Sequence, residues 1–194
     1  MIRTAVGSAR LVPRGEDVHV NGPGSVSDLV ALLARGAGVR DEPELDGLAH
    51  ALQCGAILRA EHPDDPELAV AGLVHDIADI AYPDDHTDHD RRGATLVEPL
   101  LGPRVARLVG AHVVAKRYLV TTDPAYRAGL SPRSAQTLAA QGDALTEADL
   151  DALAADPDLS AILDLRRADE RAKDPLARVP DLDSWRSILS EVAQ

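Results

Sequence analysis

Phenylalanine does not occur among the 194 residues of this sequence, and its other aromatic residues are one Trp and three Tyr. Proteins that stack nucleic-acid bases present several aromatic rings, so this scarcity argues against such a platform. Positive charge is scarce as well, because 20 Lys and Arg residues stand against 32 Asp and Glu residues, and the formal net charge is −12. Nucleic acids and anionic membranes attract basic proteins, so we expect neither as a partner.

The single cysteine, Cys54, cannot form a disulfide within the chain and is typical of a reducing compartment. No apolar run approaches the ~18 residues of a membrane span, and the N-terminus has no signal-peptide core. We therefore expect a cytoplasmic protein that does not enter a membrane. The sequence carries no signal for an oligomeric state.

Residues 1–25 show no hydrophobic period and contain several Gly, Pro and charged residues, which predicts a flexible leader. From residue 26 to 194, apolar residues recur at intervals of three and four, and the alternation typical of strands is absent. This length fits one domain, so the sequence predicts an all-α, single-domain helical bundle. Ser27 and Asp28 are expected to cap its first helix. The later helices are expected at residues 43–61, 66–80, 90–101, 103–119, 132–140, 147 onward, 157–172 and 183–192.

Histidines and aspartates form an ordered series along these expected helices, and in one place they are adjacent. Imidazole and carboxylate together suit Fe, Mn or Zn, and the lack of thiol partners argues against a structural zinc site. Taken singly, each residue is more often a packed or solvated side chain than a ligand, but cores of helical bundles are common places for metal sites. Five or six ligands exceed what one tetrahedral ion needs, which favours two ions and a bridging carboxylate. The series is His50, His75, Asp76, His89, His112 and Asp169.

This series resembles the H…HD…D pattern of the HD-domain superfamily. A closer resemblance, over about residues 46–174, is to its di-iron oxygenase branch, which includes 2-amino-1-hydroxyethylphosphonate dioxygenase. The resemblance implies a helical bundle of the HD-domain type over residues 26–194, two iron ions as Fe(II) and Fe(III), O2 as co-substrate and a small anionic substrate. The segments that carry it include LAHALQCGAIL, AVAGLVHDIADI, DHDRRGATLV, AHVVAKRYL and LRRADERAK.

The resemblance also implies roles for individual residues. Lys116 matches the lysine that binds the phosphonate, and it lies four residues after His112, on the same helical face. Ser134 and Gln141 match positions that line the anion pocket. The ordinary alternative is that these side chains cap a helix or lie in solvent on the surface. The metal ligands carried over are His50, His75 and Asp169 for one iron, His89 and His112 for the other, and Asp76 as the bridge.

Arg166 precedes Asp169 by about one helical turn, so we expect it to support either the phosphonate or that aspartate. Asp79 replaces a histidine of the branch, because HDIGH becomes HDIAD, and it is expected to be catalytic together with Lys116. His86 competes with His89 as a ligand, and His89 is favoured because the motif RGATL follows it closely.

The branch reads the far end of its substrate with a Tyr and a Glu shortly before the first histidine, whereas no Tyr precedes Tyr82 here. Glu42 and Glu44 are the candidate replacements for the acid. We therefore expect the substrate to be an α-hydroxylated anion other than the aminoethyl compound.

The function predicted is oxidative cleavage of the C–P bond of a small α-hydroxylated phosphonate, giving phosphate and a carboxylic acid. The first alternative is a metal-dependent HD phosphohydrolase acting on a small phosphate ester, in which the metals activate water. The second is a protein that binds metal and senses a small anion; the complete ligand set disfavours it, since unused ligands are costly to bury.

Overall fold

The computed structural model describes residues 22–42 and 45–194, with residues 40–42 described as backbone only. Most of the expected leader therefore lies outside the described residues, and so do Glu44 and the side chain of Glu42. The elements in chain order are α1 (Val26–Ala34), β1 (Arg40–Glu42), β2 (Leu45–Asp46), α2 (Gly47–Glu61), α3 (Pro66–Val74), α4 (Ile77–Ala81), α5 (His89–Thr122), α6 (Pro124–Ala128), α7 (Pro132–Ala140), α8 (Glu147–Ala154), α9 (Leu159–Arg171), the 3-10 turn η1 (Leu182–Trp185) and α10 (Arg186–Val192).

Helices build the core, so the expected all-α fold is confirmed. In addition, β1 and β2 pair antiparallel, with Arg40 opposite Asp46. Strands this short show no period of two in the sequence, which explains why the pattern did not predict them. Because of this pair, α2 begins at Gly47 and not at the expected residue 43, and the Asp46 side chain caps it by accepting a hydrogen bond from the backbone N–H of Ala49.

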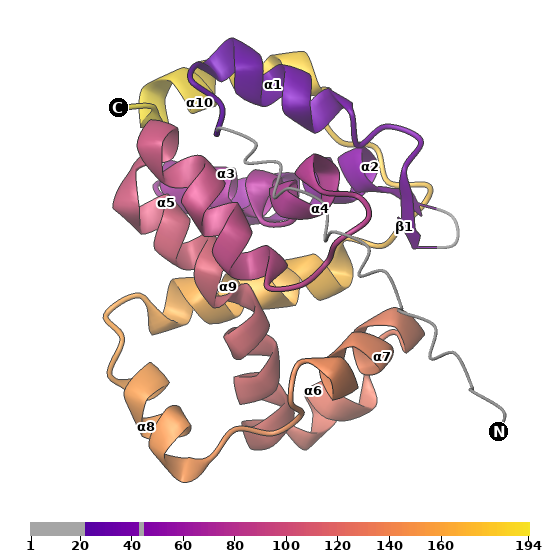
Figure 1. The fold of residues 1–194 in the computed structure, drawn as a ribbon, viewed down its shortest axis with the longest axis vertical. Coiled ribbons are helices and arrows are strands. Elements are labelled where there is room, and N and C mark those ends of the chain that lie inside the picture. Colours follow the sequence, from indigo (N-terminus) through magenta and orange to yellow (C-terminus); the bar gives the residue numbers. More distant parts are fainter. Residues whose placement is uncertain (1–21, 43–44) are drawn as a thin grey trace, which may run out of the picture.

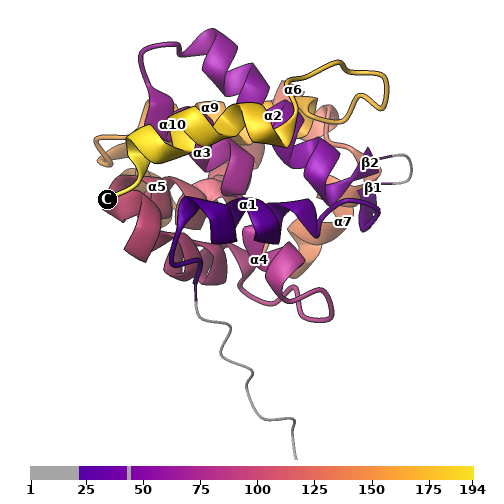
Figure 2. The same ribbon diagram turned by 90° about the horizontal axis from the view of Figure 1, so that it is seen from above.

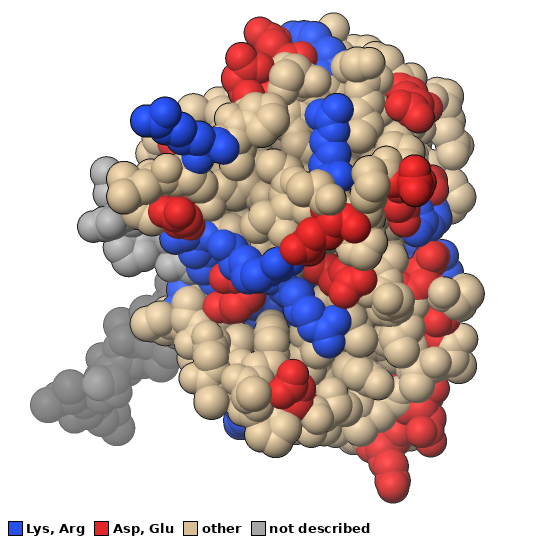
Figure 3. All heavy atoms as spheres, turned by 180° about the vertical axis from the view of Figure 1, so that it is seen from behind, with Lys and Arg blue, Asp and Glu red and all other residues tan. Residues whose placement is uncertain are grey.

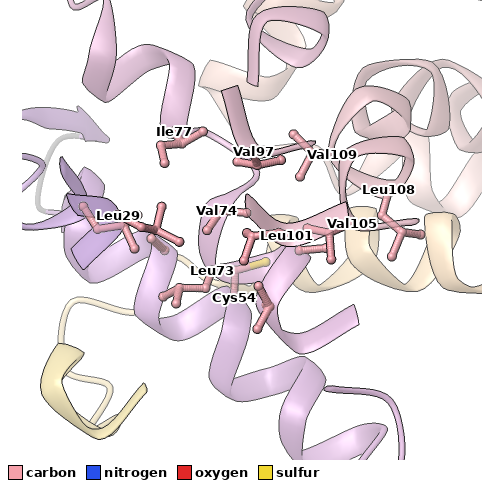
Figure 4. Close-up of a cluster of buried hydrophobic side chains, with 14 of the residues drawn as sticks. Leu29, Cys54, Leu73, Val74, Ile77, Val97, Leu101, Val105, Leu108 and Val109 are labelled. Carbon is pink, nitrogen blue, oxygen red and sulfur yellow. The ribbon is translucent and has the colours of Figure 1, made fainter. Parts of the chain in front are cut away.

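Helix α3 lies at the centre of the bundle, and every residue from Leu68 to Val74 is buried. Helices α2, α5, α9 and α10 all pack against it. Figure 4 shows Leu73 and Val74 of α3 among apolar side chains of α1, α2, α4 and α5. Burying one such aliphatic side chain contributes about 1.5–3 kcal/mol, so this core fixes the helices on which the histidines lie.

The chain forms a larger and a smaller part on the two sides of α9. Figure 1 shows α6, α7 and α8 beyond α9, on the side away from α1 and α10, with the second half of α5 reaching into this smaller part. Seen from above in Figure 2, α1 and α10 lie side by side across the larger part, in agreement with their contacts. Among the described residues, no helix has both the length and the apolar character needed to cross a membrane.

The expected helix over residues 66–80 is interrupted at the adjacent histidine and aspartate. Helix α3 ends at Val74 and α4 begins at Ile77, and between them Asp76 has φ −101° and ψ 20°. Adjacent residues of a continuous helix do not face each other. The break therefore lets the side chains of His75 and Asp76 approach the same point, which an uninterrupted helix would prevent.

Two further helix boundaries depend on backbone details. Helix α5 bends at Gly102, whose φ is +80°, and this bend separates the two helices expected at 90–101 and 103–119. The first helix is capped by Ser25, whose Oγ accepts from the backbone N–H of Asp28, and not by Ser27 as expected. Serine at either position suits an N-cap, so the pattern alone misplaced it by two residues. The short helix α6 was not expected.

Candidate metal centre and anion cavity

The helical bundle brings the whole series of predicted ligands to one place. His50 comes from α2, His75 and Asp76 from the turn between α3 and α4, His89 and His112 from the two halves of α5, and Asp169 from α9. All are buried or partly buried. Residues that are far apart in the sequence thus meet where four helices face one another.

One group of donor atoms gathers around His50. Its Nε2 lies 3.2 Å from Nε2 of His75 and 3.3 Å from Oδ1 of Asp169. Oδ2 of Asp76 completes the group, 3.1 Å from Nε2 of His75 and 3.6 Å from Nε2 of His50. The donors that lie close enough together to hold one ion are His50, His75 and Asp76, with Asp169 beside them.

A second group gathers around His112. Its Nε2 lies 3.0 Å from Nε2 of His89 and 3.6 Å from Oδ1 of Asp76, and that oxygen is 4.0 Å from Nε2 of His89. Asp76 therefore directs Oδ2 toward the first group and Oδ1 toward the second. One carboxylate shared in this way is the arrangement that a bridge between two metal ions requires.

Hydrogen bonds from the far side of each ring fit a metal and not a simple polar core. Nδ1 donates to a backbone carbonyl oxygen in His50 (2.8 Å to Ala172), in His75 (2.8 Å to Gly72) and in His112 (2.7 Å to Val109). In the neutral ring Nε2 is then an acceptor. When neutral, His50 and His75 face each other with two acceptors, which a metal cation between them satisfies. Burial lowers the pKa of both rings, but the carboxylates of Asp169 and Asp76 outweigh it and raise both pKa values, so without a metal a proton takes that place.

The distances between these nitrogens suit the same conclusion. Two imidazole nitrogens bound to one ion at about 2.1 Å lie roughly 3.0–3.4 Å apart at octahedral to tetrahedral angles. The separations of 3.2 Å for His50 and His75 and 3.0 Å for His89 and His112 match that range. The residues present therefore fit two metal ions.

The charges of the buried groups also call for cations. Burial raises the pKa of Asp76, but the positively charged imidazole of His75 beside it more than offsets this and holds that pKa well below its usual value. In Asp169 burial is likewise outweighed, mainly by the guanidinium of Arg166. Burial lowers the pKa of His112 to about 3, so this ring is neutral, as a metal ligand must be.

His86 and His89 occupy different surroundings. His89 belongs to the second donor group, whereas Nδ1 of His86 lies 2.9 Å from Oδ1 of Asp79 and half of its side chain is exposed. Burial, and then the negative charge of Asp76, raise the pKa of Asp79. The geometry thus places His89 with the metal-binding donors and pairs His86 with Asp79.

A cavity of about 710 Å³ opens over both donor groups. Lysine and arginine side chains line it although the chain as a whole is acidic, and Figure 3 shows such side chains crossing the middle of one face beside Asp and Glu. A hollow with metal-binding donors and buried cations is suited to a small anion. The four residues expected to bind substrate all line it, namely Lys116, Ser134, Gln141 and Arg166.

Lys116 is buried, with 4% of its surface exposed, and its Nζ donates to Oγ1 of Thr137 over 2.8 Å. Burial, and then the charge of Arg166, lower the pKa of Lys116 to about 8. Among the described residues, Thr137 is the one hydrogen-bond partner of this ammonium. An ammonium has three N–H donors, so two remain for a ligand in the cavity.

Four neighbouring side chains bind the guanidinium of Arg166. Its Nε donates to the hydroxyl of Tyr126 over 2.6 Å, and its terminal nitrogens form ion pairs with Asp169 and Glu170 and a 3.2 Å hydrogen bond to Oγ of Ser134. Of the two roles expected for Arg166, these contacts favour support of Asp169.

Ser134 and Gln141 differ in how far their polar atoms are already engaged. The hydroxyl of Ser134 donates to Glu170 over 2.8 Å and accepts from Nζ of Lys173 over 3.0 Å. Oε1 of Gln141 is buried without a hydrogen-bond partner among the described residues. A ligand in the cavity would therefore gain more from Gln141 than from Ser134.

Sequence reasoning missed three residues that complete this wall. Thr137 lies three residues after Ser134 and four before Gln141, so the helical spacing of α7 carried the signal. Glu170 and Lys173 follow Asp169 closely in the sequence, and no role was predicted for either. Their contacts with Ser131, Ser134 and Arg166 depend on how α7 and α9 approach each other, which no local pattern specifies.

An all-α bundle whose facing helices bring together a histidine, an adjacent His-Asp pair and a later aspartate is typical of HD-domain proteins. The family model for the HD domain matches residues 26–174, and the chain is a member of the HD domain family. Among curated proteins it is 31% identical over 148 residues to hydroxymethylphosphonate dioxygenase of Gimesia maris, covering 71% of this chain and 73% of that protein. It is also 31% identical over 140 residues to [1-hydroxy-2-(trimethylamino)ethyl]phosphonate dioxygenase (glycine-betaine-forming) of Leisingera caerulea, covering 68% of this chain and 71% of the relative.

Proposed function

We propose that this protein is a di-iron, O2-dependent oxygenase that cleaves the C–P bond of a small α-hydroxylated phosphonate. The reaction consumes R–CH(OH)–PO3²⁻ and one O2, and it yields R–COO⁻, HPO4²⁻ and one proton. The C–P and C–H bonds break, the carbon and phosphorus each gain an oxygen, and O2 takes up four electrons. The names of the two relatives, both phosphonate dioxygenases, support this class of reaction.

The observation that carries the proposal is the position of Asp76 between two donor groups that open on the same cavity as Lys116. Two metals and one buried ammonium suit a ligand that has a hydroxyl next to a phosphonate. The hydroxyl then lies at the metals, and the phosphonate lies at the ammonium of Lys116. Iron suits a site of imidazoles and carboxylates. When bound, the iron ions would supply Lewis acidity and a redox couple through which electrons of the substrate reach O2.

The protein's own residues bind and orient the substrate. Lys116 binds the phosphonate as a buried point charge, and the unpaired Oε1 of Gln141 is an acceptor for the hydroxyl of the same ligand. Arg166 keeps Asp169 in place. The carboxylate of Asp79, paired with the exposed His86, provides a route by which the released proton reaches solvent.

The test uses the full chain loaded with iron under nitrogen, and it measures O2 uptake and phosphate release with hydroxymethylphosphonate and its C1-substituted analogues. We expect one phosphate per O2 consumed and no phosphate under nitrogen. Release of phosphate from phosphate esters without O2 would contradict the proposal, since that is the behaviour of an HD phosphohydrolase.

A further inference from the structure

A second cavity, of about 260 Å³, adjoins the metal centre. The anion-binding residues Lys116 and Gln141 are not among its lining residues. The residues that line both cavities are His50, Asp76, Asp79, His86 and Arg133. Since His50 and Asp76 belong to the metal-binding donors, a ligand held at the metals borders both the anion cavity and the second cavity.

The wall that belongs to the second cavity alone is aliphatic. It is built by the residue before the β1–β2 pair, by α2 and by the helices on either side of the His75–Asp76 break, and among the described residues no aromatic ring lines it. A volume of about 260 Å³, against ~30 Å³ for a water molecule, holds a chain of a few carbon atoms. The side chains of this wall are Val39, Ala51, Leu73, Ile77, Ile80 and Pro83.

The charges around the second cavity do not favour a cationic group. Among the described side chains, which leave out residues 40–44, Asp79 is the only carboxylate of this cavity besides the metal-binding Asp76, and Oδ1 of Asp79 lies 2.9 Å from Nδ1 of His86. The guanidinium of Arg133 lines the same space. An ammonium group placed there would meet a carboxylate that is already hydrogen-bonded, without the aromatic faces that stabilise quaternary ammonium ligands.

We propose that the second cavity receives the substituent on C1 of the substrate, and that this enzyme prefers 1-hydroxyalkylphosphonates with a short, uncharged alkyl group. This proposal rests on the proposed function and specifies its substrate class. The named substrate of one relative has only hydrogen at this position, and that of the other has a trimethylammonium group. The alkyl group takes no part in the reaction and leaves on the carboxylic acid.

Binding under nitrogen separates this proposal from catalysis. Calorimetry on the iron-loaded full chain compares hydroxymethyl-, 1-hydroxyethyl- and 1-hydroxypropylphosphonate with 2-amino-1-hydroxyethylphosphonate. Each added carbon buried in an aliphatic pocket should lower Kd about fourfold. The amino compound matches the propyl compound in size and differs in charge, so we expect it to bind at least tenfold more weakly than the propyl compound.

Variants of the wall give a second measurement. A Cβ at Gly47 would lie 3.7 Å from the Gly36 carbonyl oxygen, so Gly47→Val has room in the backbone and narrows the cavity. It should raise Kd for the propyl compound relative to the hydroxymethyl compound by fourfold or more. Ile80→Val should shift the preference toward a chain one carbon longer. Ile162→Val is the matched control, because Ile162 is buried in α9 away from this cavity, and it should leave the ratio unchanged.

The outcomes separate the two proposals. If the phosphonates bind without preference for an alkyl group, or if the amino compound binds best, the second cavity does not have the role assigned to it, and the proposed function stands. If alkyl preference and the variant effects are found but no O2 is consumed, the cavity has its role and the proposed reaction is wrong. If no phosphonate binds, both proposals fail.

Discussion

Replacing Lys116 by Met should weaken phosphonate binding while leaving the metals in place. Methionine keeps the length of the side chain and removes its charge, and a protonated Nζ has no lone pair with which to bind a metal ion. A hydrogen bond to a charged group contributes about 1.5–3 kcal/mol. Since about 1.4 kcal/mol corresponds to a factor of ten, Kd for hydroxymethylphosphonate should rise roughly 10–150-fold.

The pH dependence of binding gives an independent check on this residue. Because burial lowers the pKa of Lys116 to about 8, its ammonium loses the proton as pH rises through that value. Binding to the unmodified protein should therefore weaken above pH 8, and the variant should not show this step. The sign follows from the charge, since the protonated form present at lower pH is the one that attracts the anion.

Calorimetry measures Kd, and metal analysis of the same samples is the control. A variant that binds within twofold of the unmodified protein, with metals retained, would refute the assigned contact. Loss of the metals together with binding would also refute it, because Lys116 would then support the metal centre.

Two other changes test the surroundings of the site. Arg166→Met removes the guanidinium from the buried carboxylate of Asp169, while Glu170 keeps its contact with Lys173, so it should destabilise the fold by about 3–5 kcal/mol in urea unfolding and lower the metal content; an unchanged midpoint would contradict the support given to Asp169. Gly102→Ala forces a side chain into positive φ at the bend of α5 and should cost roughly 1–2 kcal/mol in the same assay, with no change in metal content; full stability would show that this bend is not strained by a Cβ.

The sequence predicted the helical fold and named the residues that meet in the two donor groups, but not how the fold brings them together. The apolar spacing continues from residue 66 to 80, so it predicts one helix there. The break after Val74, which brings His75 and Asp76 to the same point, follows from packing against α2 and α5, not from the local pattern. The resemblance named the pair as metal ligands without predicting that break.

Helical spacing also explains which residues of the anion cavity could be predicted from the sequence and which could not. Thr137 shares a face of α7 with Ser134 and Gln141, so it was predictable from the period of the helix. The contacts of Arg166 with Tyr126 and Ser134 join segments more than thirty residues apart, as does the second cavity. Such contacts depend on tertiary structure, and composition and periodicity contain no information about them.

The central claim is that Asp76 serves two metal ions, and metal content per chain tests it most directly. The unmodified protein should bind two ions, and Asp76→Ala should lose both, because each donor group loses one of its members. Asp79→Ala is the matched control; it removes a nearby aspartate that belongs to neither group and should retain both ions. One ion in the unmodified protein, or loss of a single ion in Asp76→Ala, would contradict the shared carboxylate.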